Sequence, residues 1–309
     1  MSEGEDNEAD AQPCSCCASC GIVEVDDIKL VPCDDCDLVE YCGDECRENH
    51  KSVHEEDCKK RATELREEIL FKQPESSHLG DCPICSLPMP IEMAKSMMFG
   101  CCSKTICSGC AYAYQMRQRE GRLANTCPFC REPLPRTEEE NDKRSMKRVA
   151  ANDPFAIYQE GGKQYEKGDY RSAFEYYSKA AELGYASAHH TLAWLYQNGE
   201  GVEKDGEKFI HHLEEAAIGG NPLARHDLGC HENKNGNFER AVKYWIISAT
   251  QGLDGSLKTL MEAFKQGHVS KEVLAAALRA HKAAVDATKS PQRVAAEGVF
   301  HMLISPPQH

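Results

Sequence analysis

The residues best able to do chemistry in this chain are its 18 cysteines. Seventeen lie between Cys14 and Cys130, mostly in closely spaced pairs, and only Cys230 lies outside this window. Such clusters form disulfides in an oxidising compartment or hold a metal in a reducing one. The acidic start of the chain and the lack of a long apolar run predict neither a secretory signal nor a membrane span. We therefore interpret the protein as intracellular, cytoplasmic or nuclear, with cysteines that bind zinc.

The first cysteine block offers eight ligand side chains, the number that two tetrahedral zinc ions require. The eight are Cys17, Cys20, Cys33, Cys36, Cys42, Cys46, His54 and Cys58. A Cys-x-x-Cys pair presents two thiolates from a tight turn, and ligands four residues apart share one face of a helix. Two alternatives stay open, because Cys14 could pair with Cys17 and His50 could replace His54. The block has few other core-forming residues, so we expect metal binding and folding to be one event.

Residues 14–58 resemble a MYND-type zinc finger, chiefly through Tyr41-Cys42-x-x-x-Cys46 and His54-x-x-x-Cys58. The resemblance implies that alternate ligand pairs share a zinc. One site would hold Cys17, Cys20, Cys42 and Cys46, and the other Cys33, Cys36, His54 and Cys58. The resemblance also implies a protein-binding surface. Lys51 stands where many members carry an aromatic residue, and Glu55 stands where they often carry a lysine.

The second cysteine block contains eight more thiols: Cys82, Cys85, Cys101, Cys102, Cys107, Cys110, Cys127 and Cys130. Residues 81–135 resemble a RING-type zinc finger, which implies that the first and third pairs share one zinc and the second and fourth the other. The histidine usual in that family falls at Lys104, so Cys101 must supply the missing thiolate beside Cys102. The alternative is a degenerate finger that binds only one zinc ion tightly. Together the two blocks predict about four zinc ions per chain.

A RING-type finger implies a ubiquitin ligase, which docks a ubiquitin-charged conjugating enzyme and catalyses by positioning rather than by covalent chemistry. We therefore expect no nucleophile or general base. Three residues match the contact positions of such ligases: Ile84 inside the first pair, Pro128 inside the last pair, and Arg131 directly after the last ligand. Arg131 would bridge the enzyme and ubiquitin, because its fork of donors suits two carbonyl groups at once.

Beyond Pro154 the chain contains a repeat of alanines, aromatic residues and glycines. Residues 168–184 align without gaps with residues 236–252, and an intermediate copy lies at 208–221. The resulting period of 32–36 residues predicts stacked helix pairs. Residues 184–221 resemble a SEL-one-like repeat, the longer-looped relative of the tetratricopeptide repeat, which implies a surface that binds a partner protein. The alternative is a stack that only spaces or dimerises the fingers.

Other features of the sequence concern ligands and partners. We expect Cys230 to be a buried apolar residue and four histidines of the repeats to pack or face solvent rather than bind metal: His189, His190, His211 and His212. The formal net charge is −14, from 36 basic and 50 acidic residues. An acidic chain is repelled by phosphate backbones, which argues against nucleic acid and in favour of protein partners.

The sequence thus predicts small zinc-stabilised α+β fingers followed by an all-α helical-repeat solenoid. The expected parts are a disordered acidic tail (1–13), the first finger (14–58), a helical linker (59–80), the second finger (81–135), a charged linker (136–153), the repeats (154–288) and a C-terminal tail (289–309). The predicted function is that of a ubiquitin-ligase-like adaptor. Its second finger recruits a conjugating enzyme, while the repeats and first finger bind the substrate or partner. The alternative is a non-catalytic interaction scaffold with a degenerate second finger.

Overall fold

The computed structural model describes residues 16–76, 78–121 and 124–298. The expected acidic tail, Cys14 and the residues after 298 lie outside this part of the chain. The chain divides into two compact units, Met1–Lys72 and Gln73–His309.

The first unit contains two short strands and one long helix. Strand β1 (Val31–Pro32) pairs antiparallel with β2 (Glu40–Tyr41), and α1 (Asp44–Leu70) follows directly. Acidic residues begin α1, where they interact favourably with the positive end of the helix dipole. Because α1 is continuous, the last ligands of the first block and most of the expected helical linker belong to one helix.

Apolar side chains contribute little to the core of the first unit. Five aliphatic side chains around the strands are between 43% and 53% exposed: Ile22, Val23, Val25, Val31 and Leu38. The buried residues that the structure describes in this unit are Cys17, Cys36, Tyr41, His54 and, at the end of α1, Leu70. A domain this small usually needs a metal or disulfides to fold. The cysteines and His54 therefore take the place of a hydrophobic core.

The second unit begins with a small finger built on a hairpin and a helix. After the single turn η1 (Met93–Lys95), strand β3 (Ser96–Phe99) pairs antiparallel with β4 (Lys104–Cys107), and α2 (Ser108–Arg119) follows. Phe99 is 3% exposed and meets the rings of Tyr114 and Phe129 edge-on. This aromatic cluster supports the hairpin whose turn carries Cys101 and Cys102.

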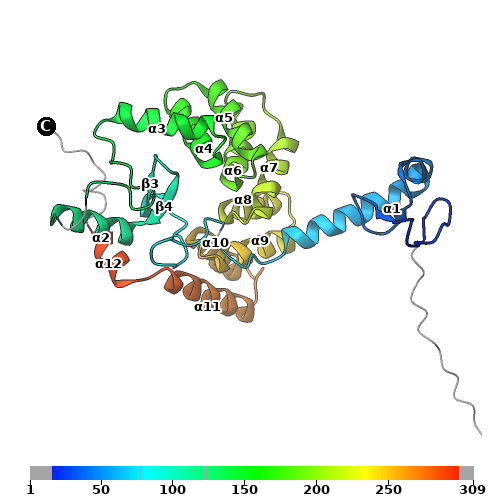
Figure 1. Ribbon diagram of the computed structural model, residues 1–309. Helices are drawn as coiled ribbons and strands as arrows, with labels where there is room; N and C mark the ends of the chain where they lie inside the picture. Colours follow the sequence, from blue (N-terminus) through cyan, green and yellow to red (C-terminus); the bar gives the residue numbers. More distant parts are fainter. Residues whose placement is uncertain (1–15, 77, 122–123, 299–309) are drawn as a thin grey trace, which may run out of the picture. The chain divides into compact units, whose positions relative to one another are not determined.

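The rest of the second unit is a stack of helices, seen in Figure 1 as the green-to-orange coils. The stack comprises α4 (Pro154–Glu166), α5 (Tyr170–Glu182), α6 (Ala186–Asn198), α7 (Gly206–Ile218), α8 (Pro222–Lys234), α9 (Phe238–Thr250), α10 (Asp254–Lys265) and α11 (Lys271–Ala287). Helix α4 packs on α5, α6 on α7 and α8 on α9, and successive pairs contact one another. This arrangement confirms the predicted fold class.

The repeated glycines and alanines have distinct places in the stack. The glycines end tight turns between helices with φ between 80° and 98°, a region that other residues rarely adopt. They are Gly168, Gly184, Gly220, Gly236 and Gly252. The alanines are buried where paired helices approach each other: Ala173, Ala181, Ala217, Ala241 and Ala249. The repeat detected in the sequence is therefore a repeat of turns and close contacts.

Two further helices lie in the segments expected to be a charged linker and a C-terminal tail. Helix α3 (Glu138–Ala150) is capped by the Thr137 hydroxyl, which accepts from the backbone N–H of Glu140. Its Val149 belongs to the core cluster of the first helix pair. Helix α12 (Pro291–Glu297) lies against α2, as Figure 1 shows. Within the described residues, no helix is long and apolar enough to cross a membrane.

Candidate metal centres

The sixteen predicted ligands gather into four groups, and the ligand atoms of each group lie within 4.8 Å of one another. Site 1 contains Cys17, Cys20, Cys42 and Cys46, and site 2 contains Cys33, Cys36, His54 and Cys58. Site 3 contains Cys82, Cys85, Cys107 and Cys110, and site 4 contains Cys101, Cys102, Cys127 and Cys130. The structure thus brings together the same sets of four that the two resemblances implied.

Four of the Cys-x-x-Cys pairs lie on turns of one construction. In the pair that begins at Cys17, the N–H of Gly21 donates to the Cys17 carbonyl at 2.9 Å, and the N–H of Cys17 donates to the Ile22 carbonyl at 2.8 Å. The residue four positions after the first cysteine has positive φ in every case: Gly21, Asp37, Ser86 and Arg131. The left-handed residue lets the chain reverse, so that both thiols point to the same side of the turn.

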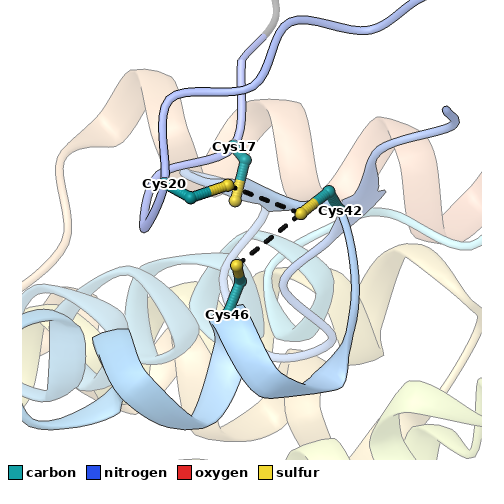
Figure 2. Close-up of side chains that lie close together, drawn as sticks. All are labelled: Cys17, Cys20, Cys42 and Cys46. Carbon is teal, nitrogen blue, oxygen red and sulfur yellow. Dashed lines mark hydrogen bonds between the residues drawn. The ribbon is translucent and has the colours of Figure 1, made fainter.

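Site 1 has the geometry of a tetrahedral thiolate centre. The Cys42 Sγ atom lies 3.6 Å from the Sγ atoms of both Cys20 and Cys46, the two contacts marked by dashed lines in Figure 2. Zinc–sulfur bonds of about 2.3 Å at tetrahedral angles place sulfur atoms about 3.8 Å apart. Cys46 lies in the first turn of α1 and Cys42 directly follows β2, so the site joins the strands to the helix.

The electrostatics of site 1 favour a bound cation. Burial acts to raise the pKa of Cys17, but backbone N–H groups of Cys20, Cys42 and Ser19 outweigh it and lower the pKa to about 6. The neighbouring side chains of Cys20 and Cys46 raise the pKa of Cys42 to about 12. Ionisation of one thiol therefore makes ionisation of its neighbour less favourable. A divalent ion with affinity for sulfur compensates this repulsion between thiolates.

Site 2 uses the one histidine ligand. The Sγ atoms of Cys33 and Cys58 are 3.7 Å apart, and His54 Nε2 lies 3.0 Å from Cys36 Sγ. A tetrahedrally coordinated zinc ion would hold its sulfur and nitrogen ligands about 3.5 Å apart. A small increase in the distance between His54 Nε2 and Cys36 Sγ would therefore accommodate the ion. His50, the alternative ligand, lies outside the cluster, because its Nδ1 faces the Tyr41 hydroxyl at 3.2 Å and its ring stacks on His54.

Site 3 is more buried than site 4, the other candidate site in the second finger. Cys82 and Cys107 are fully buried, and the Sγ atoms of Cys85 and Cys107 are 3.8 Å apart. Burial acts to raise the pKa of Cys82, but backbone N–H groups of Cys107, Cys85 and Ile84 outweigh it and lower the pKa to about 7. The backbone is thus arranged to favour a thiolate at Cys82.

In site 4 the adjacent residues Cys101 and Cys102 both reach the same candidate metal site. Cys102 Sγ lies 3.7 Å from Cys127 Sγ, and Cys101 Sγ lies 3.3 Å from Cys130 Sγ. The hairpin turn makes this possible, because Ser103 has φ of 54° and its N–H donates to the Phe99 carbonyl at 2.8 Å. Burial raises the pKa values of both thiols. Lys104 is exposed on β4 and belongs to no ligand cluster among the described residues.

The predicted contact residues of the second finger are all exposed. Ile84 is 48% exposed although it stands directly before Cys85, a ligand of site 3, and Pro128 is exposed directly after Cys127, a ligand of site 4. Arg131 is the left-handed residue of the turn that begins at Cys127, with φ of 61°. An aliphatic side chain, a proline and a cation are therefore presented by the two ligand turns.

The other cysteines and histidines that the structure describes lie outside these clusters. Cys16 is exposed, and Cys230 lies 3.6 Å from the His226 ring nitrogen on the same helix. In the repeats, His189 and His212 face each other with their Nδ1 atoms 3.0 Å apart, and His190 contacts Asp227 at 2.9 Å.

Sequence reasoning missed one residue at site 3. The Arg293 guanidinium from α12 donates to Cys85 Sγ at 3.5 Å. No spacing rule connects a cysteine with an arginine more than 200 residues away, so only the tertiary structure identifies it.

Comparisons with known proteins agree with the two types of domain. The MYND finger family matches residues 13–58, and the Sel1 repeat family matches residues 145–185, 186–221 and 224–253. Over 53 residues, 17% of the chain, the sequence is 38% identical to the "Putative RING finger protein ORF96" of Ostreid herpesvirus 1 (isolate France). The chain covers 22% of that relative's length.

Two solved structures are similar to part of the chain. A Sel1 repeat protein from Oxalobacter formigenes is 22% identical with a TM-score of 0.44, over 58% of this chain and 80% of that one. The protein c5321, a protective antigen of uropathogenic Escherichia coli with an SLR fold, is 25% identical with a TM-score of 0.40, over 48% of this chain and 33% of that one. The expected resemblances to a MYND finger and to Sel1 repeats are confirmed by the family matches.

Proposed function

We propose that this zinc-finger and Sel1 repeat protein is a ubiquitin-ligase-like adaptor. Its second finger recruits a ubiquitin-charged conjugating enzyme, and its repeats and first finger bind the protein to be modified. The observation that carries the proposal is the exposed set of Ile84, Pro128 and Arg131 on the two ligand turns of a finger with eight clustered cysteines. Over 53 residues the chain is also similar to a relative named as a RING finger protein, which supports the presence of a finger of this type.

The residues of the finger act by binding and orienting. Ile84 and Pro128 give the conjugating enzyme an apolar contact on rigid turns, which limits the entropy lost on docking. Arg131 presents several N–H donors in a fixed plane and holds two carbonyl groups at once. Catalysis then consists of holding the thioester in a conformation ready for attack. Zinc supplies structural stabilisation when bound, because it fixes the ligand turns that carry these side chains.

The repeats supply a surface for a protein partner. Trp194 on α6 is 42% exposed, and its indole N–H donates to the Asp227 carboxylate of α8 at 3.2 Å. A tryptophan fixed in this way on a repeat surface is a common anchor in protein interfaces. We assign partner binding to the face of α6 and α8 around Trp194, and a Trp194→Ala variant should lose the partner while it keeps its zinc.

Metal analysis tests the ligand sets. We expect four zinc ions per chain, and three after Cys102→Ala, because that change removes one thiolate of site 4. Cys16→Ala is the matched control, because Cys16 is exposed and belongs to no cluster, and it should still bind four. A complete site 4 would be contradicted if the native protein bound only three zinc ions and the Cys102→Ala variant also bound three.

Autoubiquitination with a panel of conjugating enzymes tests the activity itself. Ile84→Ala and Arg131→Ala should each lower the rate about tenfold or more, because each removes a central interface contact. The matched controls are Leu183→Ala, an aliphatic side chain that is 44% exposed, and Arg171→Ala, whose side chain is 87% exposed. If the zinc-loaded protein is inactive with every enzyme of the panel, the ligase proposal is wrong.

The second candidate is a non-catalytic scaffold that uses both fingers to bind proteins. Lys104 at the family's histidine position and the adjacent ligands Cys101 and Cys102 favour it. A scaffold would retain its zinc and its Trp194-dependent partner but would bind no conjugating enzyme in titrations.

A further inference from the structure

The C-terminal helix α12 docks on the second finger. This helix has only seven residues, and two of its side chains are almost completely buried: Arg293 is 6% exposed and Ala296 is fully buried. Its start is fixed by Ser290, whose hydroxyl accepts from the backbone N–H of Arg293 at 3.2 Å. Figure 1 shows α12 beside α2, the helix that carries Cys110. Because so short a helix is unstable alone, its contacts with the finger must hold it in place.

The two helices approach each other backbone to backbone at Gly109. This glycine lies in the first turn of α2, between the ligands Cys107 and Cys110. A Cβ atom added to Gly109 would lie 2.6 Å from the backbone nitrogen of Arg293 and 2.8 Å from the carbonyl carbon of Gln292. Glycine inside a helix costs about 0.5–1 kcal/mol relative to alanine, so it needs a structural reason. The docking of α12 provides that reason.

The guanidinium of Arg293 ties α12 to the segment that follows Cys85. Its Nη1 donates to the Pro88 carbonyl at 2.8 Å and to the Thr288 carbonyl at 2.7 Å. Its Nη2 donates to the Leu87 carbonyl at 3.2 Å and faces Cys85 Sγ at 3.5 Å. The group therefore connects the end of α11, the start of α12 and the first ligand turn of the second finger.

The charge of site 3 complements the buried cation. Four thiolates with one divalent ion carry a net charge of about −2, which is costly to bury unless a cation lies close. The Arg293 guanidinium lies 3.5 Å from the Sγ atom of Cys85, one ligand of this site. Its positive charge therefore offsets part of the negative charge of the site.

We infer that Arg293 is a positioning residue of site 3 and that α12 completes the second finger from the far end of the chain. The guanidinium compensates the charge of the metal centre and fixes the turn that carries Ile84. The helix does not cover the proposed docking surface, because Ile84, Pro128 and Arg131 stay exposed. The inference concerns metal retention and holds whether or not the finger recruits a conjugating enzyme.

Zinc transfer from the full chain to a chromogenic chelator tests the inference. Arg293→Gln should speed the release of one zinc ion of the four by about 10–100-fold, the usual effect of removing a group that supports metal ligands. Arg293→Lys keeps the charge but loses the fork of donors, so its rate should fall between those of native and Arg293→Gln. Arg279→Gln is the matched control, because it removes the same charge from an exposed position on α11 and should release zinc at the native rate.

A second variant displaces the helix without touching the arginine. Gly109→Ala raises the helix propensity of α2 but blocks the approach of α12, so it should speed the release of the same single ion. The double variant should release it no faster than the faster single variant, because both changes break one contact. In the cobalt-substituted protein, both single variants should shift the sulfur-to-metal absorption band of one site, a change that a general loss of stability would not produce.

Three results would overturn the inference. Native zinc release from Arg293→Gln would show that the guanidinium does not support site 3. Equal acceleration by Arg279→Gln would show a general charge effect. Acceleration of all four ions together would show that the substitution loosens the whole chain rather than one centre.

Discussion

Gly161 and Gly162 are neighbours in α4, yet we expect their replacement by alanine to change stability in opposite directions. A Cβ atom at Gly161 would lie 2.8 Å from Cε1 of Tyr177, a buried ring, and 3.2 Å from Cβ of Tyr176. A Cβ atom at Gly162 would meet only the Tyr177 hydroxyl, at an ordinary 3.7 Å. The two positions therefore separate helix propensity from packing.

The magnitudes follow from these contacts. Either change gains about 1 kcal/mol of helix propensity, because alanine replaces glycine inside a helix. Gly161→Ala also costs about 1–3 kcal/mol, because the Tyr177 ring has no room to move away. We expect Gly162→Ala to stabilise the fold by up to about 1 kcal/mol and Gly161→Ala to destabilise it by up to about 2 kcal/mol.

Urea denaturation of the zinc-loaded chain, followed by far-ultraviolet circular dichroism, measures both effects as shifts of the midpoint. The helices of the stack dominate this signal, and the two variants share the same composition. If both variants shift the midpoint in the same direction by the same amount, the close approach of α4 and α5 at Gly161 is refuted.

Two other predictions concern metal and pH. Chelation of the metal should unfold the fingers but leave most of the helical circular dichroism signal. The reason is that the core clusters of the stack contain none of the sixteen predicted ligands. A complete loss of the helical signal would contradict this prediction. Burial, and then the charges of His190 and Arg225, lower the pKa of His78 to about 4. Because the unfolded value is about 6.5, this histidine binds its proton first in the unfolded chain, and stability should fall by up to about 3 kcal/mol as the pH drops from about 6.5 towards 4. In His78→Gln this component of the pH dependence should be missing from urea midpoints, and an unchanged slope would disprove it.

Much of the candidate site could be predicted because ligand spacing is a local property. Two cysteines separated by two residues face one side of a turn, and His54 and Cys58 share a face of α1. Which two pairs share one ion depends on contacts between residues far apart in the sequence. The family resemblances implied these pairings, and the structure groups the same residues. The pairing of Cys101 with Cys102 depended on a bend at Ser103 that the sequence did not reveal.

The repeats were predictable for a similar reason. Glycine at a left-handed turn and alanine at a close helix contact recur at each step of a stack, so the sequence repeats when the structure does. The capped helix α3 is different. Its strongly charged sequence predicted a solvated linker or a charged helix, and the structure has a helix whose Val149 packs into the first core cluster. One apolar residue in a charged segment is too weak a signal to predict that packing.

The sequence by itself thus determined the number and type of the candidate metal ligands, their division into two unlike cysteine blocks and the stack of helix pairs, because each of these depends on spacing along a short stretch of chain. Only the tertiary structure decided that α12 packs on α2 at Gly109 and that Arg293 reaches Cys85. Contacts of this kind depend on the fit of two surfaces far apart in the sequence, and no local pattern records that fit.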